Sequence, residues 1–342
     1  MPARNLGQAK GVLLAVLTDS YGRVTRKLRI SVTDRCNFRC QFCMPTHPVW
    51  LPHSEILTFE EIHRVASLFV QMGVENIRLS GGEPLMRRDI EELVKLLTGI
   101  PGLRQFSMTT NGFLLAEKAS ALRRAGLKGI TVSLHSLKPE RFSEITGGGP
   151  FDQVINGIKA AKASGFKPLK INAVIIRGCN DDEIADLAAL AVEGDVTVRF
   201  IEYMPFDGER HWGMEKVVSG KEIVEKVQER YDLLPEPRPA GSTAQLYRFK
   251  DGAGEIGVIT SITQPFCSDC DRVRISADGK IVPCLFDKTG FDLRPLLRTG
   301  ASDGAILGFM RGAVRQKAPG VETLLKKYQQ LEHIRPMHTI GG

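Results

Sequence analysis

The sequence lacks the features that mark secreted proteins and polyanion-binding proteins. Its seven cysteines are an odd number and are grouped as three, one, two and one, unlike a disulfide framework. Its 46 basic residues give a net charge of +7 but contain no run of five, which argues against a polyanion-binding tail. These absences favour metal binding by the cysteines in a reducing cytoplasm.

Long apolar segments, internal repeats and low-complexity stretches are missing as well. The apolar run Val12 to Leu17 is too short to span a bilayer, and no small-residue cleavage site follows it, so we expect a strand or a packing segment there. With 42% apolar and 25% charged residues in a chain of 342, the composition is typical of a soluble protein with one large or two ordinary domains. We expect a cytoplasmic protein that contacts no membrane and no nucleic acid.

Alternating strand and helix patterns cover the first two thirds of the chain. Strands are expected at Leu28–Thr33, Asn76–Ser80, Arg104–Thr109, Gly129–Leu134, Leu169–Ile175 and Val196–Ile201. Helices are expected at Thr58–Met72, Arg87–Leu97, Leu114–Arg124, Phe151–Ser164, Asp181–Val192 and Ser219–Glu229. Six such units predict an α/β fold, an incomplete six-unit parallel β/α barrel, with a doubly wound open sheet as the alternative.

The pattern changes after the proline-rich stretch Pro235–Pro239, which reads as a linker. Beyond it we expect short strands, a tight turn and a helix, at Leu246–Lys250, Glu255–Ile262, Val273–Ser276, Asp278-Gly279 and Val321–Gln330. The predicted organisation is an N-terminal arm (1–25), the partial barrel (26–234), a smaller C-terminal iron–sulfur domain (235–330) and a tail (331–342).

Two sets of three cysteines are the strongest chemical signal. Cys36, Cys40 and Cys43 have Cys-x3-Cys-x2-Cys spacing, and polar residues separate them, which is unlike a buried apolar core. A zinc site usually closes with a fourth ligand, and none fits this local run. Three thiolates suit a four-iron cluster that keeps one iron open for a ligand.

The second set is Cys267, Cys270 and Cys284, with Cys-x2-Cys-x13-Cys spacing. Zinc would again need a fourth ligand, and the one spare thiol, Cys179, reads as an ordinary residue near a turn. A second open-iron cluster is therefore favoured over zinc. Arg272 and Arg274 flank this set on one face of a strand, where guanidinium groups can bind an anion.

Residue parity within the strands separates an apolar face from a polar, cationic one. The polar faces carry Arg29, Arg78, Lys170 and Arg199, whereas a parallel sheet packed on both faces would be apolar throughout. An antiparallel sheet with a wet face is the alternative, but the helices between the strands argue against it. We expect a cationic barrel lumen that binds an anion.

These motifs together resemble the molybdenum cofactor biosynthesis protein A family, GTP 3',8-cyclase, within the radical S-adenosylmethionine (SAM) superfamily. The resemblance runs from about Leu17 to Gly342 and includes the segment around the first cysteines, the Gly-Gly-Glu-Pro segment at Gly81–Pro84 and the final Gly341-Gly342. It implies a radical SAM lyase that converts GTP to 3',8-cyclo-7,8-dihydro-GTP, the first step of molybdenum cofactor biosynthesis.

The resemblance also assigns roles to individual residues. The six cysteines named above are implied to hold two [4Fe-4S] clusters. Contacts to SAM are implied for Phe42, Gly82, Ser133 and Met204. GTP contacts are implied for Arg29, Arg78, Thr109, Lys170, Arg272, Val273 and Arg274. Gly341 and Gly342 are implied to enter the site and assist the reaction, although a frayed end is the ordinary expectation for two terminal glycines.

The resemblance also implies partner proteins, and this sequence differs from the family at two positions. The family implies a reductant such as flavodoxin or ferredoxin, a downstream cyclic pyranopterin monophosphate synthase and a homodimer. Phe42 replaces a frequent tyrosine of the family, and His135 replaces a frequent acid. The alternatives are a peptide-modifying radical SAM enzyme with an auxiliary cluster, and a basic iron–sulfur protein that binds RNA or transfers electrons.

Overall fold

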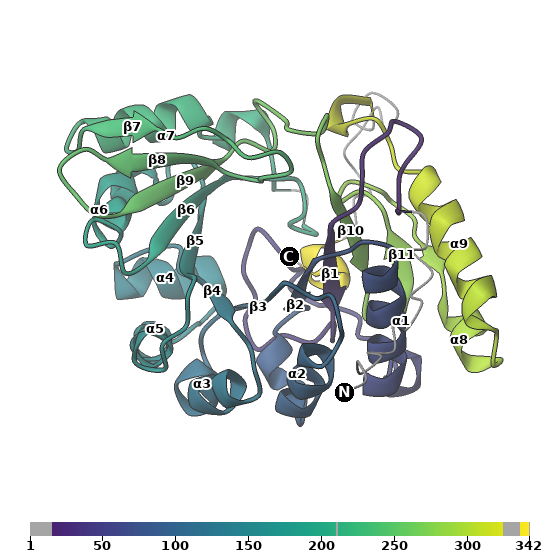
Figure 1. The fold of residues 1–342 in the computed structure, drawn as a ribbon. Coiled ribbons are helices and arrows are strands. Elements are labelled where there is room, and N and C mark those ends of the chain that lie inside the picture. Colours follow the sequence, from purple (N-terminus) through teal and green to yellow (C-terminus); the bar gives the residue numbers. More distant parts are fainter. Residues whose placement is uncertain (1–15, 210, 324–335, 342) are drawn as a thin grey trace, which may run out of the picture.

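The computed structural model describes residues 16–209, 211–323 and 336–341, and it begins with the six predicted strand–helix units (Figure 1). The strands are β1 (Lys27–Ser31), β2 (Asn76–Ser80), β3 (Gln105–Thr110), β4 (Gly129–Ser133), β5 (Leu169–Ile175) and β6 (Thr197–Glu202). The helices that follow them are α1 (Phe59–Gln71), α2 (Ile90–Thr98), α3 (Leu115–Arg124), α5 (Phe151–Ala163), α6 (Ile184–Ala189) and α7 (Gly220–Gln228). The predicted boundaries lie close to the observed ones.

Strands from the C-terminal part of the chain extend this sheet at both edges. On one side β9 (Glu255–Ile259) pairs in parallel with β6, and on the other β10 (Arg272–Ile275) pairs in parallel with β1. Antiparallel strands complete the edges, namely β8 (Gln245–Phe249) and β7 (Leu233–Pro235) next to β9, and β11 (Lys280–Val282) and β12 (Phe291–Asp292) next to β10. The 12-stranded sheet runs β12-β11-β10-β1-β2-β3-β4-β5-β6-β9-β8-β7.

The helices that follow the six strands lie on the outer side of the curved sheet (Figure 1). On the outer side, alternate strand residues such as Leu28, Ile30 and Ile77 are buried in one large apolar core. The partial barrel is therefore confirmed, because a doubly wound sheet carries helices on both faces.

Some helices were not predicted from the sequence, and some predicted segments lie outside the described residues. The short helix α4 (Pro139–Thr146) and, near the C-terminus, α8 (Arg294–Arg298) and α9 (Asp303–Arg315) were not predicted. The expected linker begins inside β7, where Pro235 is tolerated because β7 is an edge strand. Most of the expected helix Val321–Gln330 and of the apolar run Val12 to Leu17 lies outside the described residues, and the domain boundary at 235 stays a prediction.

No helix in the described ranges is both long enough and apolar enough to cross a membrane.

Candidate active site

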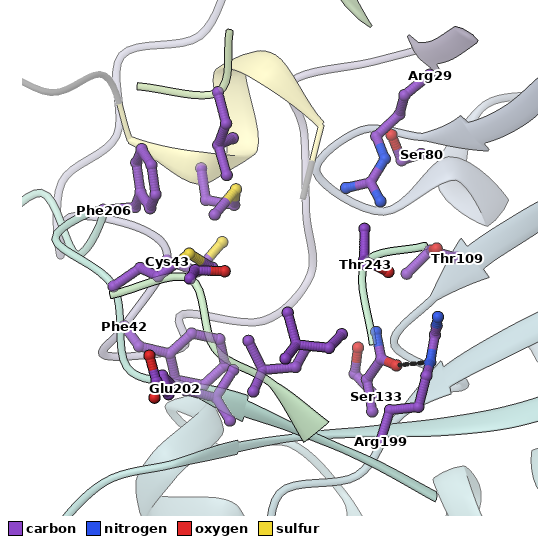
Figure 2. A pocket seen from close by; sticks show the side chains of 18 of the residues that line it. Arg29, Phe42, Cys43, Ser80, Thr109, Ser133, Arg199, Glu202, Phe206 and Thr243 are labelled. Carbon is purple, nitrogen blue, oxygen red and sulfur yellow. Dashed lines mark hydrogen bonds between the residues drawn. The ribbon is translucent and has the colours of Figure 1, made fainter. Parts of the chain in front are cut away.

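A cavity of about 270 Å³ occupies the inner side of the sheet, and both cysteine sets line it (Figure 2). The first set follows β1, at the carboxyl end of the parallel strands, where barrels usually place their sites. Cys267 and Cys270 instead precede β10, and Cys284 follows the antiparallel β11, so the second set lies at the amino end of the parallel strands. The cavity therefore connects the two ends of the barrel.

The first cysteine loop is held by backbone contacts to its surroundings. The N–H groups of Arg39 and Gln41 donate to the carbonyls of Thr146 and Ile145 at the end of α4, at 2.9 and 3.1 Å. The Cys36 Sγ accepts hydrogen bonds from the backbone N–H of Phe38 at 3.4 Å and from the Asn111 Nδ2 at 3.9 Å. Burial raises the pKa of Cys36 to about 11 and that of Cys43 to about 12.

The second cysteine set is the more electropositive of the two. The Arg272 Nη2 donates to the Cys270 Sγ at 3.2 Å. Burial opposes ionisation of Cys270, but the charges of Arg272 and Lys317 outweigh it and lower the pKa of that thiol to about 7. Burial raises the pKa of Cys284 to about 12.

Both cysteine sets suit iron–sulfur clusters better than a single ion. In the described part of the chain, no three His, Cys, Asp or Glu side chains converge as ligands of one metal ion. Thiolates of a cluster bind separate irons and need not converge on one point. At each set a hydrogen-bond donor contacts a cysteine sulfur, as donors commonly do around the thiolates of a cluster.

A row of arginines crosses the inner face between the two cysteine sets. Arg274, Arg29, Arg78 and Ser107 are direct neighbours on β10, β1, β2 and β3 in the strand register. Arg199 on β6 adds a further guanidinium, which donates through Nε to the Asn172 Oδ1 at 3.0 Å. Figure 2 shows Arg29, Thr109 and Arg199 on the side of the cavity opposite Cys43 and Phe42.

These arginines have no carboxylate partner among the described residues, and some of their donors are free. Burial and neighbouring arginines lower the pKa of Arg29 and Arg199, which marks a site that disfavours further positive charge. The Arg272 Nη1, the Arg274 Nε and the Thr109 Oγ1 are buried without a hydrogen-bond partner in the described structure. Unsatisfied buried donors are rare in folded proteins, so this set fits a bound anion.

The Gly-Gly-Glu-Pro segment is packed directly on the first cysteine loop. A Cβ on Gly82 would overlap with the carbonyl oxygens of Asp34 and Arg35, so only glycine fits there. Glu83 is fully buried and accepts hydrogen bonds from the N–H groups of Leu85 and Asn111, at 2.9 and 2.6 Å. Burial raises the pKa of Glu83 to about 7, and the sequence-based site did not include this residue.

The described part of the C-terminal tail, residues 336–341, reaches the inner face of the barrel, where Figure 1 shows its short helix beside β1. The short helix α11 (Met337–Ile340) docks on the first cysteine loop, and its Met337 N–H donates to the Cys43 carbonyl at 3.1 Å. Gly341 has a φ of 76°, and its carbonyl accepts from the Arg29 Nη1 at 3.3 Å. Gly341 is therefore not a frayed end, and Gly342 lies outside the described residues.

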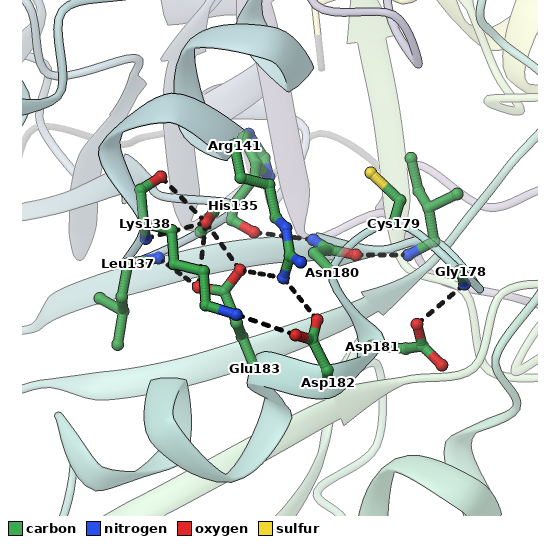
Figure 3. Close-up of polar contacts among 12 residues, drawn as sticks. His135, Leu137, Lys138, Arg141, Gly178, Cys179, Asn180, Asp181, Asp182 and Glu183 are labelled. Atoms are coloured by element: carbon green, nitrogen blue, oxygen red, sulfur yellow. Dashed lines mark hydrogen bonds and ion pairs between the residues drawn. The ribbon is translucent and has the colours of Figure 1, made fainter.

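Phe42 and His135 form one wall of the cavity, with ring centroids 4.6 Å apart. Burial lowers the pKa of His135 to about 3, and its Nδ1 accepts from the Val174 N–H at 3.1 Å. The loop that carries His135 is fixed by two buried side chains, Asn180 and Glu183 (Figure 3). Asn180 donates to the His135 carbonyl at 2.7 Å, and Glu183 accepts from the Leu137 N–H at 2.7 Å.

The remaining predicted residues divide between the cavity and its surroundings. Ser133, Met204 and Thr109 line the cavity. Lys170 lies on the same polar face, at the start of β5, but does not line the cavity itself. Val273 is 1% exposed and packs in the apolar core, since it has the opposite parity from Arg272 and Arg274, so its side chain does not reach the cavity.

The sequence-based site also omitted Arg199 and Glu202. Parity had placed Arg199 on the polar face, so that signal was available. Glu202 is fully buried and accepts from the N–H groups of Gly220 and Ile262, at 2.9 and 2.8 Å, which joins three segments beside the cavity. No local sequence pattern predicts these contacts.

Comparisons with known proteins agree with this geometry. Residues 30–191 match the family model of the radical SAM superfamily, and residues 196–323 match the Molybdenum Cofactor Synthesis C model. The chain is 48% identical to the GTP 3',8-cyclase of Acidothermus cellulolyticus over 85% of its length and 82% of that protein. It is 43% identical to the GTP 3',8-cyclase of Pelotomaculum thermopropionicum over 95% of its length and 100% of that protein.

Among solved structures, the fold resembles that of Streptococcus suis SuiB bound to the precursor peptide SuiA. The TM-score is 0.64 at 17% identity, over 93% of this chain and 77% of SuiB, so this likeness concerns the fold alone. The identities to the two cyclases, each over most of both proteins, place the function more narrowly. The chain belongs to the GTP 3',8-cyclase family of the radical SAM superfamily.

Proposed function

We propose that this chain is a GTP 3',8-cyclase that works with two [4Fe-4S] clusters, one at each end of the barrel lumen. Cys36, Cys40 and Cys43 would hold the cluster that binds SAM, and Cys267, Cys270 and Cys284 would hold the second. When bound, the first cluster and SAM would supply the one-electron radical chemistry that the cyclisation needs. The observation that carries the proposal is that both cysteine sets and the unpaired arginines line one cavity.

The arginine row is proposed to bind the triphosphate of GTP. Guanidinium groups bind phosphate oxygens in bidentate geometry, and Arg29, Arg78 and Arg274 present three of them side by side. The free donors of Arg272 and Arg274 lie next to the second cysteine set, where the guanine end would meet the second cluster. GTP would thus be held at both ends, which fixes the ribose toward the first set.

The protein's remaining contribution is positioning and the exclusion of water. Phe42 and His135 would support the cofactor beside the first cysteine set, together with Ser133, Met204 and the Gly82 backbone. Gly341 would close the lumen next to Arg29, and a part for Gly342 in the reaction stays a prediction. A reductant such as flavodoxin or ferredoxin, a downstream cyclic pyranopterin monophosphate synthase, a cytoplasmic location and a homodimer stay predictions.

The two-cluster count can be tested with Cys284→Ala and the matched control Cys179→Ala. After anaerobic reconstitution we expect about eight irons per chain in the wild type and in the control, but about four in Cys284→Ala. Cys284→Ala should still cleave SAM and form no cyclised product. Eight irons and full turnover in Cys284→Ala would remove this residue from the ligand set.

The triphosphate site can be tested with Arg78→Ala against Arg88→Ala. Arg88 lies in the connection between β2 and α2, outside the cavity lining, and its side chain is 94% exposed. Loss of a charge-assisted contact should weaken GTP binding about 10- to 100-fold in Arg78→Ala. We expect no change in Arg88→Ala, and equal affinities for the two variants, measured by calorimetry without SAM, would contradict the assignment.

Lys170 should make GTP binding depend on pH. Burial and the charges of Arg199 and Arg78 lower the pKa of Lys170 to about 8, so its cation is present below pH 8 and is lost above it. A guanidinium is a stronger base than an amine, so the arginines keep more of their charge over this range even where burial lowers their pKa. GTP affinity should therefore fall by up to about tenfold between pH 7 and pH 9 in the wild type. In Lys170→Arg it should stay nearly constant over the same range. Parallel pH profiles for the two proteins would exclude Lys170 from the site.

The tail can be tested at Gly341. A side chain there would adopt a disfavoured positive φ and would overlap with the Ser80 Oγ. Gly341→Ala should fold and cleave SAM but lose cyclised product, and Ser80→Ala combined with it should recover part of the loss. Gly148→Ala is the matched control, because Gly148 also has a positive φ but has no atom near its Cβ position. Normal product formation by Gly341→Ala would show that the tail has no part in the reaction.

A further inference from the structure

Lys317 is a buried cation behind the second cysteine loop, outside the cavity lining. It follows α9 and is 4% exposed. Its Nζ donates to the carbonyl oxygens of Cys270 and Arg272, both at 2.8 Å. These two carbonyls are its hydrogen-bond acceptors within the described ranges, and no carboxylate there forms an ion pair with it.

A second buried cation, Arg23, holds the other half of the same loop. Its Nη1 donates to the carbonyl oxygens of Cys267 and Pro319, both at 2.8 Å, and its Nη2 donates to the carbonyl of Ala318 at 2.6 Å. Its Nε pairs with the Asp19 carboxylate at 2.6 Å, so the charge of Arg23 is balanced. Arg23 therefore fastens the segment around Lys317 to the cysteine loop without adding net charge.

The segment that carries Lys317 packs closely against the cysteines. A Cβ on Gly320 would lie 3.3 Å from the Cβ of Cys267 and 3.7 Å from its Sγ. An ammonium group buried without a counter-ion loses several kcal/mol of hydration free energy, and carbonyl dipoles restore only part of it. A negative charge near Cys267 and Cys270 would restore the rest.

A [4Fe-4S] cluster held by three thiolates is such a charge, because it is a net anion that gains a further negative charge on reduction. We propose that Lys317 is the counter-charge of the second cluster and raises its reduction potential, while Arg23 fixes the loop. Lys317 acts through the Cys270 segment and touches no reacting atom, so it is a positioning residue. The inference rests on the proposed second cluster.

The test uses redox titration followed by electron paramagnetic resonance on the anaerobically reconstituted full-length chain. A background with Cys36, Cys40 and Cys43 replaced by alanine isolates the signal of the second cluster. Lys317→Met removes the charge and the hydrogen bonds, Lys317→Gln removes the charge but keeps a donor, and Lys317→Arg keeps the charge. Lys118→Met, which removes a partly buried lysine on α3, is the matched control.

We expect a lower midpoint potential in Lys317→Met and Lys317→Gln, and a potential near that of the wild type in Lys317→Arg and Lys118→Met. A Lys317→Gln potential equal to that of the wild type would overturn the inference, since the hydrogen bonds alone would then suffice. If removing the charge prevents cluster loading, retention of iron in Lys317→Arg alone supports the role of the charge, and equal loss in all three Lys317 variants overturns it. Absence of iron from the triple-alanine background with Lys317 unchanged would instead refute the second cluster itself, and this result distinguishes failure of the proposed cluster from failure of the Lys317 inference.

Discussion

Like charges on one face of adjacent strands constrain the whole structure. Arg274, Arg29 and Arg78 are direct neighbours in a parallel sheet, with backbones about 5 Å apart. Burial and repulsion from the neighbouring arginines together lower the pKa of Arg29. No carboxylate among the described residues pairs with these guanidinium groups, and this is why we propose that an anion from solution binds there.

The sheet topology explains how this row comes to lie between two cysteine sets. Because β10 joins the edge formed by β1, the chain returns to the barrel with its second cysteines at the amino end of the strands. The first set lies at the carboxyl end, and the lumen between them is lined by side chains that point inward at mid-strand. A barrel of eight closed units would fill that lumen with side chains, whereas this open sheet keeps a cavity of about 270 Å³.

The local sequence pattern was sufficient to predict much of this arrangement. Period-two parity identified Arg29, Arg78 and Lys170, because inward and outward residues alternate whatever the neighbouring strand is. The same parity excludes the Val273 side chain from the cavity, although a resemblance to the family had included it. The pairing of β9 and β10 with opposite edges could not be predicted, since it joins segments far apart in the chain and leaves no periodic trace. Glu202 and Lys317 were missed for a related reason, because their partners are backbone groups of distant segments.

Two kinds of buried cation lie near the second cysteine set. They differ in whether they keep hydrogen-bond donors without a partner. Arg272 and Arg274 face the cavity and keep nitrogen atoms without a partner, which is the state expected of groups that bind and release a ligand in every turnover. Lys317 lies behind the cysteine loop and outside the cavity lining. Two backbone carbonyls accept hydrogen bonds from its ammonium group, so its hydrogen bonds are made while its charge has no partner in the described part of the chain. The charge of Lys317 can therefore be balanced by an anion that stays bound nearby without touching it. An anion that binds and leaves in each turnover would instead need free hydrogen-bond donors. Arg272 and Lys317 thus contact Cys270 from two sides. Arg272 does so from the cavity, and Lys317 does so from behind the cysteine loop.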